Sequence, residues 1–507
     1  MTRLDVDVAI AGSGFSGSIL AAILQRHGLK VALIDRASHP RFAIGESSTP
    51  TANLILRDLA DRYGLSWLRP LSQYGTWKQT YPHLTSGIKR GFAYFWHEPD
   101  CEFVPSAEHQ NELLVAASSG DEISDTQWLR SDVDAFLFEQ ACGEGVTPFE
   151  STTIDALTAL SPGWKLVCRS PEGPVDIHCR FLVDGTGVGG LLSQHLQIAD
   201  DSARLLTKSR AVFGHFDNLP RWSSLLEGKA GGATADHPFD CDHSALHHLL
   251  TDGWMWWLRF DNDLTSVGVV LDDSVLGDTA TQPATGDGVA AVINGFPDLK
   301  QALQSARLVA PTSGPVRTGR LQRLASRIAG ADWAMLPHAA GFIDPLHSSG
   351  IAHSLGGVER LAQILLRQQD GRGFEDALAD YESTVRSELL LIDQLVSGCY
   401  SALRQRSFGK FVSWSMCYFA AATSWERRRL ETATADAALF LADDTGFRQT
   451  VNDLQSRIET ESDDRFEQLC EERLAPFNHV GLFRPPVPNM YARTAVPDEG
   501  DDCCGGT

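Results

Sequence analysis

Val6-Asp7-Val8-Ala9-Ile10-Ala11-Gly12-Ser13-Gly14-Phe15-Ser16-Gly17 is the stretch of sequence that decides the fold. Its first half is mostly apolar, which predicts a buried strand, and its second half is a G-x-G-x-x-G turn. A helical stripe and a second strand follow, and that strand ends in Asp35. The glycines permit close approach of the backbone to a pyrophosphate, and the acid can bind ribose hydroxyls. This order predicts a dinucleotide-binding unit without deciding between FAD and NAD.

The composition excludes several classes of partner. The chain has 507 residues, 43% of them hydrophobic, which is enough for a large core and too long for one simple domain. Lys plus Arg number 43 and Asp plus Glu 65, so the formal net charge is −22, which argues against nucleic acid and anionic membranes. The longest apolar run, near 411–422, is shorter than a membrane span of ~20 residues. The first residues lack the apolar core of a signal peptide, so we expect a cytoplasmic protein.

The ten cysteines are spread through the chain, and none forms a C-x-x-C pair. They are too dilute for a disulfide scaffold and lack the spacing of a metal site. We therefore predict neither a disulfide framework nor a metal centre.

A second notable stretch is Phe342-Ile343-Asp344-Pro345-Leu346-His347-Ser348-Ser349-Gly350. Apolar residues recur at helical spacing from Ile351 onward, which predicts a helix that starts near Ser349. The free N–H groups at a helix start favour anions. Taken alone, the stretch favours an ordinary capped helix after a tight turn.

Several stretches together resemble the flavin-dependent halogenases, within the wider superfamily of FAD-dependent hydroxylases and reductases. The run 39–50 resembles the P-R-F-x-I-G-E-S segment that lies along FAD in these enzymes, and 184–187 resembles their D-G-x-G element. The run 87–97 resembles the G-I-K-x-G-F segment of phenol halogenases, especially the phloroglucinol type, and 342–350 resembles the F-x-x-P-x-x-S-x-G signature. The resemblance covers most of residues 5–400 and implies an enzyme of secondary metabolism, such as antibiotic biosynthesis.

The resemblance implies FAD, in its reduced form, as the cofactor. The residues that it places at the flavin are Gly12, Ser13, Gly14, Ser16, Gly17, Asp35, Arg41, Ile44, Gly45, Ser47, Arg130, Asp344, Gly350 and Ile351. It also implies that the backbone N–H groups of Ser349 and Gly350 bind chloride or bromide. Lys89 is the implied catalytic residue, and Lys78 is a rival of lower rank.

The implied reaction converts halide and O2 to hypohalous acid, which Lys89 receives by a hydrogen bond or as a haloamine. An electron-rich aromatic substrate then takes the halogen; a phenol is expected first, with a pyrrole or an indole as alternatives. No second G-x-G-x-x-G has the right context, so we expect a separate flavin reductase to supply FADH2. A base for a phenol is not identified; Glu46, His97 and His347 are the polar residues inside the motifs.

The chain departs from the family pattern at two places. Trp254 and Trp256 are kept, but Leu258-Arg259 replaces the Ile-Pro that follows in halogenases. His338 stands where the wider class has an aspartate. The first departure leaves two alternatives open: an FAD-dependent monooxygenase or prenyl-type reductase, and a non-catalytic flavoprotein that binds an aromatic ligand. Trp414, Tyr418, Phe419 and Trp425 are candidates for lining an aromatic pocket, or for the core.

The predicted fold class is α/β. We expect a Rossmann-like FAD-binding domain, an antiparallel β-sheet substrate layer like that of p-hydroxybenzoate hydroxylase, and a helical C-terminal region. The predicted boundaries are 1–210 with 312–372 for the FAD-binding domain, 211–311 for the sheet, 373–490 for the helical region and 491–507 for a disordered tail.

Overall fold

The structure is a computed structural model that describes residues 2–229, 234–276, 292–367, 373–432, 437–494 and 496. The predicted tail, 491–507, lies outside the described residues from position 497 onward. Within the described ranges, no helix is both long enough and apolar enough to cross a bilayer.

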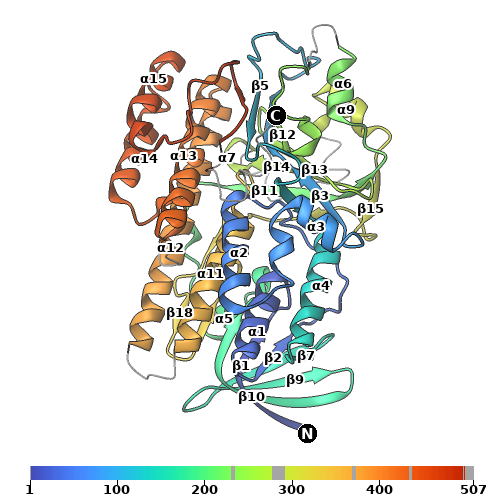
Figure 1. Cartoon of the computed structure of the whole chain (residues 1–507), viewed down its shortest axis with the longest axis vertical. Helices are drawn as coiled ribbons and strands as arrows, with labels where there is room; N and C mark the ends of the chain where they lie inside the picture. The colour runs from blue at the N-terminus through green and yellow to red at the C-terminus, as the bar shows by residue number, and fades with distance from the viewer. Residues whose placement is uncertain are drawn as a thin grey trace.

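The N-terminal part of the chain forms an eight-stranded sheet whose central strands are parallel (Figure 1). β1 (Thr2–Ala11) pairs in parallel with β10 (Gly173–Asp184) and with β2 (Val31–Ile34), and α1 (Phe15–Arg26) joins β1 to β2. The predicted order of strand, turn, helix and strand is therefore confirmed. The outer strands are β7 (Thr147–Phe149), β8 (Thr153–Ala159), β9 (Trp164–Ser170), β18 (Ala329–Gly330) and β19 (Trp333–Met335).

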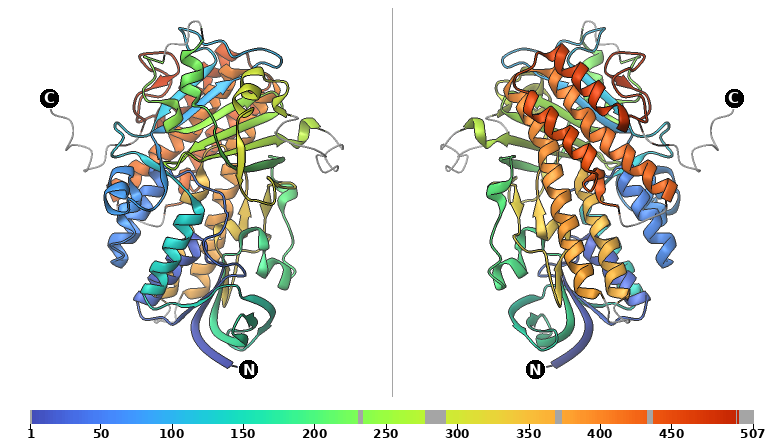
Figure 2. Two further views of the ribbon diagram at one scale, coloured as in Figure 1. Left: turned by 90° about the vertical axis from the view of Figure 1, so that its right-hand side faces the viewer. Right: turned by 90° about the vertical axis from the view of Figure 1, so that its left-hand side faces the viewer.

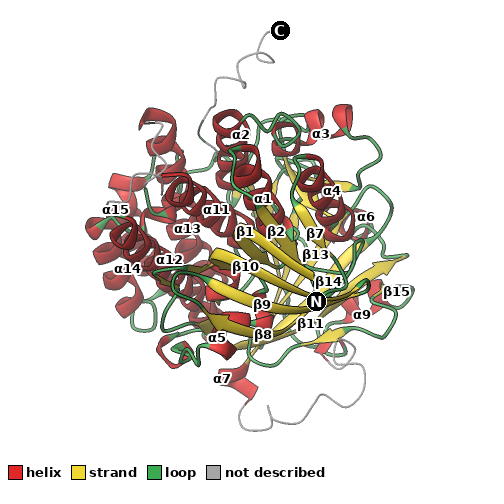
Figure 3. Cartoon of the chain, turned by 90° about the horizontal axis from the view of Figure 1, so that it is seen from below, coloured by secondary structure: helices red, strands yellow, loops and turns green. Residues whose placement is uncertain are grey.

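Long helices cover one face of this sheet, as seen from below in Figure 3. α1 packs against α4 (Arg130–Gly143) and α11 (Ser349–Arg367), and α2 (Pro50–Tyr63) packs against α11. All four residues of β2 are buried, as expected for a parallel strand that is covered on both faces.

The second sheet has nine strands and is mainly antiparallel, as predicted. β11 (Ser209–Asp217), β12 (Ala245–Leu250), β13 (Gly253–Arg259) and β14 (Thr265–Asp272) lie inside the predicted range, 211–311, or overlap it. The sheet also recruits β4 (Gly91–Trp96), β5 (Glu112–Ala116) and β21 (Met490–Tyr491) from far outside that range. Alternating aromatic residues at 92–96 predict a strand, but they do not say which sheet the strand joins. Its other strands are β15 (Arg307–Ala310) and β16 (Val316–Arg317).

The predicted helical region contains four helices that stack beside the two sheets (Figure 2). They are α12 (Phe374–Arg404), α13 (Phe408–Thr432), α14 (Thr445–Arg457) and α15 (Asp463–Leu474). One buried cluster includes Ile10 of β1, Trp254 of β13 and Leu395 of α12. The three predicted regions therefore share a continuous core.

Short elements connect these layers. β3 (Ser86–Lys89) pairs with β6 (Asp125–Trp128) in a separate two-stranded sheet, which matters for the site below. The remaining short elements are α3 (Tyr74–Thr80), α5 (Leu191–His195), α6 (Trp222–Glu227), α7 (Asp273–Leu276), α9 (Pro297–Leu303), α10 (Pro337–Ala340), β17 (Arg323–Leu324) and β20 (Gly341–Phe342).

Candidate active site

The glycine turn after β1 packs directly against a second glycine turn after β10. Gly12 has a φ of 103°, and a Cβ on Gly12 would collide with the carbonyl oxygen of Gly185. A Cβ on Gly17 would collide with the carbonyl oxygen of Gly12. Both glycines are therefore required by the packing of the turn itself, independently of any ligand.

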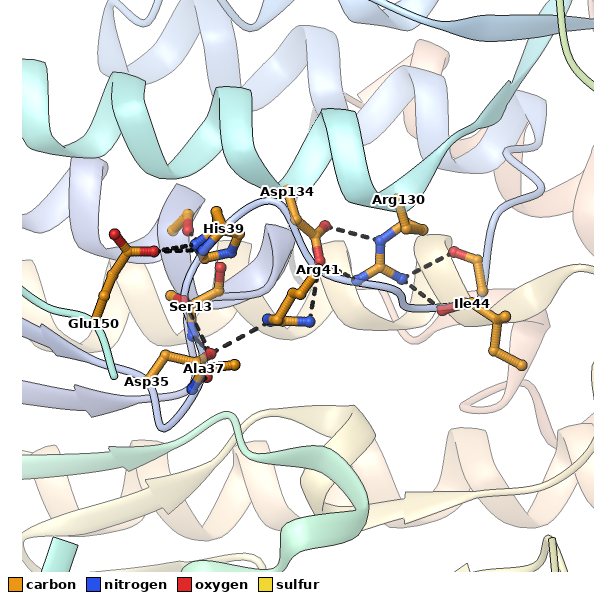
Figure 4. Close-up of polar contacts among 11 residues, drawn as sticks. Ser13, Asp35, Ala37, His39, Arg41, Ile44, Arg130, Asp134 and Glu150 are labelled. Atoms are coloured by element: carbon orange, nitrogen blue, oxygen red, sulfur yellow. Dashed lines mark hydrogen bonds and ion pairs between the residues drawn. The ribbon is translucent and has the colours of Figure 1, made fainter. Parts of the chain in front are cut away.

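Two arginines lie beside the glycine turn (Figure 4). A Cβ on Gly14 would lie 3.6 Å from a terminal nitrogen of Arg130 and 3.7 Å from one of Arg41. Arg130 donates to both carboxylate oxygens of Asp134, at 2.8 and 2.9 Å, and to the carbonyl oxygens of Ile44 and Gly45, at 2.7 and 3.1 Å. Arg130 therefore ties the start of α4 to the predicted flavin segment.

Arg41 provides the observation that tests the fit of a dinucleotide. Its Nε is buried and has no hydrogen-bond partner among the described residues, while one terminal nitrogen lies 3.3 Å from Asp35. A free buried donor beside a glycine turn and a second guanidinium matches what a pyrophosphate requires. The residues present fit FAD at this place.

Asp35 lies at the end of β2, where its carboxylate already has several donors. It accepts hydrogen bonds from the backbone N–H and hydroxyl of Ser13, both at 2.9 Å, and from the N–H of Ala37. Burial works to raise the pKa of Asp35, but these N–H donors and Arg41 outweigh it and lower the pKa. Asp35 is therefore held as a carboxylate next to the glycine turn.

The helix predicted to begin near Ser349 is α11, whose first residue is Ser349. Ser348, just before it, adopts a left-handed φ of 51°, and its hydroxyl donates to the Ser47 hydroxyl at 3.0 Å. A Cβ on Gly350 would lie 3.8 Å from His338. Burial lowers the pKa of His338 to about 3, so this neighbour of the helix start is neutral.

Two further residues of the predicted flavin set lie close to this helix start. Ile351 is buried in the first turn of α11. Asp344 accepts hydrogen bonds from Ser209 at 2.7 Å, from Tyr400 at 2.9 Å and from the N–H of Leu346. Burial raises the pKa of Asp344 to about 6. Its carboxyl group is thus already engaged by the second sheet and α12.

Lys89 ends β3 and has no exposed surface. Its Nζ donates to the carbonyl oxygen of Ser48 at 2.5 Å and lies 4.1 Å from the centre of the Phe92 ring. Asp125 is its cross-strand partner on β6, and Asn53 donates to that carboxylate at 2.6 Å. Burial lowers the pKa of Lys89 and raises that of Asp125, so burial favours the neutral form of both side chains. In contrast, Lys78 is partly exposed and pairs with Asp261 at 2.7 Å.

Two adjoining cavities lie close to Lys89, although Lys89 is not part of either wall. One has Asp125, the cross-strand partner of Lys89, in its wall; the other has Phe92, which the lysine amine contacts. Pro50, Ala117 and Glu426 line both. Tyr418 and Phe419 also line the second cavity. Of the four aromatic residues considered from the sequence, Trp414 and Trp425 are core residues instead, and their indole N–H groups bond to backbone carbonyls.

Comparison with known proteins decides the family. Residues 130–451, well over half of the chain, match the family model described as tryptophan halogenase. The chain belongs to the tryptophan halogenase family. It is therefore an enzyme of the flavin-dependent halogenase class, which uses FAD and a halide. Residues 10–84 match the NAD(P)-binding Rossmann-like domain, in agreement with the glycine turn and its context.

Relatives of this halogenase include two bacterial enzymes. It is 30% identical over 417 residues to the monodechloroaminopyrrolnitrin halogenase PrnC of Pseudomonas fluorescens, which is 80% of this chain and 69% of that protein. It is 29% identical over 380 residues to the tetracycline 7-halogenase of Kitasatospora aureofaciens, which is 72% of this chain and 64% of that protein. The matched region is thus about two thirds of the length of these relatives.

Solved structures confirm the fold of this halogenase. The halogenase PltM, solved in complex with phloroglucinol and FAD, superimposes with a TM-score of 0.82 over 93% of this chain and 96% of PltM, at 22% identity. The α/β class with a Rossmann-like FAD-binding domain, the second sheet and the helical C-terminal region is therefore confirmed.

The altered tryptophan motif of this halogenase lies in β13. The indole N–H groups of Trp254 and Trp256 donate to Tyr400 and Ser266, both at 3.1 Å, and neither ring lines the two cavities. Arg259, in the place of the family's proline, donates to Asp242 at 2.8 Å. The replacement of Ile-Pro by Leu258-Arg259 is therefore accommodated by the ion pair between Arg259 and Asp242.

The polar residues considered from the sequence as bases are engaged elsewhere in this halogenase. Glu46 contacts His215 at 2.6 Å, and His97 contacts His248 at 2.9 Å. His347 stacks on Tyr418 with ring centres 4.5 Å apart, and burial lowers its pKa to about 3. None of the three lines either cavity.

Sequence reasoning missed three acidic residues of the site. Asp134 follows Arg130 by four positions, the spacing that pairs charges on a helix, so the sequence did carry a signal for it. Asp125 and Glu426 carry no such local signal. Their proximity to Lys89 and to the cavities follows only from strand pairing and from the packing of α13.

The expectation of no metal site rested on cysteine spacing. The described residues include two groups whose ligand atoms lie close enough to share an ion: His109, Glu112 and His237, and Asp240, Cys241 and Asp242. Asp242 of the second group accepts the hydrogen bond from Arg259 described above, and the expectation of no metal site stays a prediction.

Proposed function

We propose that this protein is an FADH2-dependent halogenase that uses O2 and chloride or bromide to halogenate an electron-rich aromatic substrate, with Lys89 as the catalytic residue. The observation that carries the proposal is a continuous chain of contacts. Ser348, at the start of α11, bonds to Ser47; the neighbouring Ser48 accepts from Lys89; and Lys89 lies over Phe92 in the cavity wall. These contacts link the start of α11 to the lysine and the lysine to the cavity wall.

The flavin would be held by the glycine turn, Arg41 and Arg130, with Asp35 near the ribose. When bound, reduced FAD supplies the oxidation of halide by O2 to hypohalous acid. The guanidinium groups neutralise the pyrophosphate charge in a protein whose net charge is −22, and so a local basic site is needed for an anionic cofactor.

The halide would bind to the N–H groups of Ser349 and Gly350. They start a 19-residue helix, whose free N–H groups favour an anion, and the neutral side chain of His338 lies beside them. Gly350 leaves the backbone accessible because it has no side chain.

Replacing Gly350 with valine is expected to raise the halide concentration that gives half-maximal product formation by about tenfold or more, a cost of about 1.4 kcal/mol. A Cβ here makes only an ordinary contact with His338, so the fold is retained, but the branched methyl groups cover the N–H donors. Chloride and bromide titrations with mass-spectrometric detection of the product measure this effect. An unchanged halide dependence would place the halide elsewhere.

Lys89 would receive hypohalous acid and present the halogen to the ring. A primary amine suits this task because it is a compact, mobile donor, and burial lowers its pKa so that it can both give and take a proton near neutral pH. The aromatic residues of the cavity, Phe92, Tyr418 and Phe419, would hold the ring. The phloroglucinol bound to PltM supports a phenol as the substrate class.

The test is an assay with FAD, a separate flavin reductase, NADH, O2 and bromide against a panel of phenols, a pyrrole and an indole. A product with the bromine isotope doublet supports the proposal. A product that has gained oxygen instead would make the protein a monooxygenase, and ligand binding without turnover would make it a non-catalytic flavoprotein. Omitting the reductase tests the expected dependence on this partner.

A further inference from the structure

We propose that Glu426 is the catalytic base of this site, and that the substrate is a phenol whose hydroxyl group binds to its carboxylate. The inference rests on the proposed halogenase function. It supplies the proton acceptor that none of the motifs contains.

The position of Glu426 is the first argument. It lies on α13 and is shared by the walls of both cavities, with Asp125 in the wall of one and Phe92 in that of the other. A ring held between Phe92, Tyr418 and Phe419 would therefore have a carboxyl group in the same wall. Lys89 comes from a different element, β3, and contacts Phe92 of the same wall, which lets Glu426 act on the ring oxygen and Lys89 on a ring carbon.

The surroundings of Glu426 are the second argument. Its Oε1 accepts from the hydroxyl of Thr51 at 2.8 Å, and no ion pair with Glu426 is found among the described residues. Two other buried glutamates differ: Glu388 on α12 and Glu359 on α11 are paired with Arg360 and Arg429 at 2.6 and 2.7 Å. A buried carboxyl group without a paired cation is costly to keep unless it has another task.

The electrostatic setting suits a base for a phenol. Burial raises the pKa of Glu426 to about 8; Asp125 on β6 raises it further, while Thr51 and Arg57 on α2 oppose the shift. Tyr418 on the same helix and Arg493 in the cavity wall complete the titratable and charged surroundings, with Lys89 beyond Asp125. A phenol has a pKa of about 10, so a carboxylate with this raised pKa is a far better match than an exposed one.

The reaction balances with these groups. The carboxylate of Glu426 accepts the phenol proton while a ring carbon bonds to the halogen of hypohalous acid. The halogen–oxygen bond breaks, and the departing hydroxide takes a proton from the Lys89 ammonium to form water. The neutral amine of Lys89 then removes the proton from the halogenated carbon, and Glu426 returns its proton to the ring oxygen. The sum is phenol plus hypohalous acid giving halophenol plus water.

The test compares wild type, Glu426→Gln and Glu426→Asp in bromination of phloroglucinol between pH 6 and 9.5. For wild type, kcat/KM is expected to rise about tenfold per pH unit below pH 8, where the Glu426 carboxylate forms, and to fall at higher pH as the Lys89 ammonium loses its proton. Glu426→Gln is expected to lose at least about 100-fold at pH 7 and to recover as the phenol ionises in solution at higher pH. Glu426→Asp, which keeps a carboxylate, is expected to retain more activity than the amide.

The outcomes separate this inference from the proposed function. No brominated product from wild type with any phenol defeats the function itself. Normal bromination by Glu426→Gln at pH 7 leaves the function standing and overturns the role of Glu426. A uniform loss at every pH, together with a lower unfolding temperature or lower FAD content, would make Glu426 a structural anchor for Thr51 at the start of α2, and would also overturn it.

Discussion

Lys89→Ala is expected to abolish halogenation while reduced flavin continues to be oxidised. The amine is fully buried between Ser48 and Phe92, and Phe92 is part of the wall of the second cavity. Without it, hypohalous acid has no group to orient it toward the ring. We expect product formation to fall by at least about 10²- to 10⁴-fold, the range that a positioned proton-transferring group contributes.

The measurement pairs mass-spectrometric detection of halogenated product with the rate of flavin reoxidation. Lys78→Ala is the matched control, because Lys78 is the rival lysine and its partly exposed ion pair with Asp261 contributes little. Lys89→Met serves as a second variant that fills the volume and removes a buried amine. Halogenation that survives in both Lys89 variants would remove this residue from the mechanism.

Gly12→Ala is expected to produce a protein that no longer retains FAD and unfolds at a lower temperature. Two costs add at this position. The φ of 103° is unfavourable for any residue with a side chain, and the new Cβ would collide with the backbone of Gly185 in the second glycine turn. The new Cβ is fixed to the backbone of one turn and the carbonyl group belongs to the backbone of the other. Neither turn can therefore relax unless the end of β1 or of β10 moves.

Gly28→Ala separates these two costs. Gly28 has a similar φ of 94°, but nothing lies within 4 Å of the position that its Cβ would occupy. We expect a loss of about 1–2 kcal/mol from backbone strain alone, with FAD retained. FAD content after desalting and thermal unfolding are the readouts. Equal behaviour of the two variants would show that the packing between the glycine turns is unimportant.

Much of the fold could be predicted because its signals are local. The glycine turn, the strands on each side of it and the helix that starts at Ser349 are each specified by neighbouring residues. The membership of β4, β5 and β21 in the second sheet could not be predicted. Strand character depends on alternation within a segment, whereas the choice of partner depends on which surface is left to cover after the rest has folded.

The site divides in the same way. Arg41, Arg130 and Lys89 could be picked out because they stand inside recognisable motifs, and the structure places Arg41 and Arg130 beside the glycine turn. Trp414 and Trp425 were as plausible for the pocket as Tyr418 and Phe419, since all four are aromatic residues on one helix. Which of them face the cavity depends on the rotation of α13 against its neighbours.

The sequence by itself determined the class of fold, the glycine turn of a dinucleotide-binding unit and the motifs that lead to the halogenase family. Only the tertiary structure decided which groups surround Lys89 and the cavities. Asp125 reaches the lysine through antiparallel pairing of β6 with β3, and Glu426 reaches the cavity wall through the packing of α13 beside α2. The physical reason is that a motif encodes the conformation of adjacent residues, while the pKa and the orientation of a side chain depend on burial and charges contributed by segments hundreds of residues away.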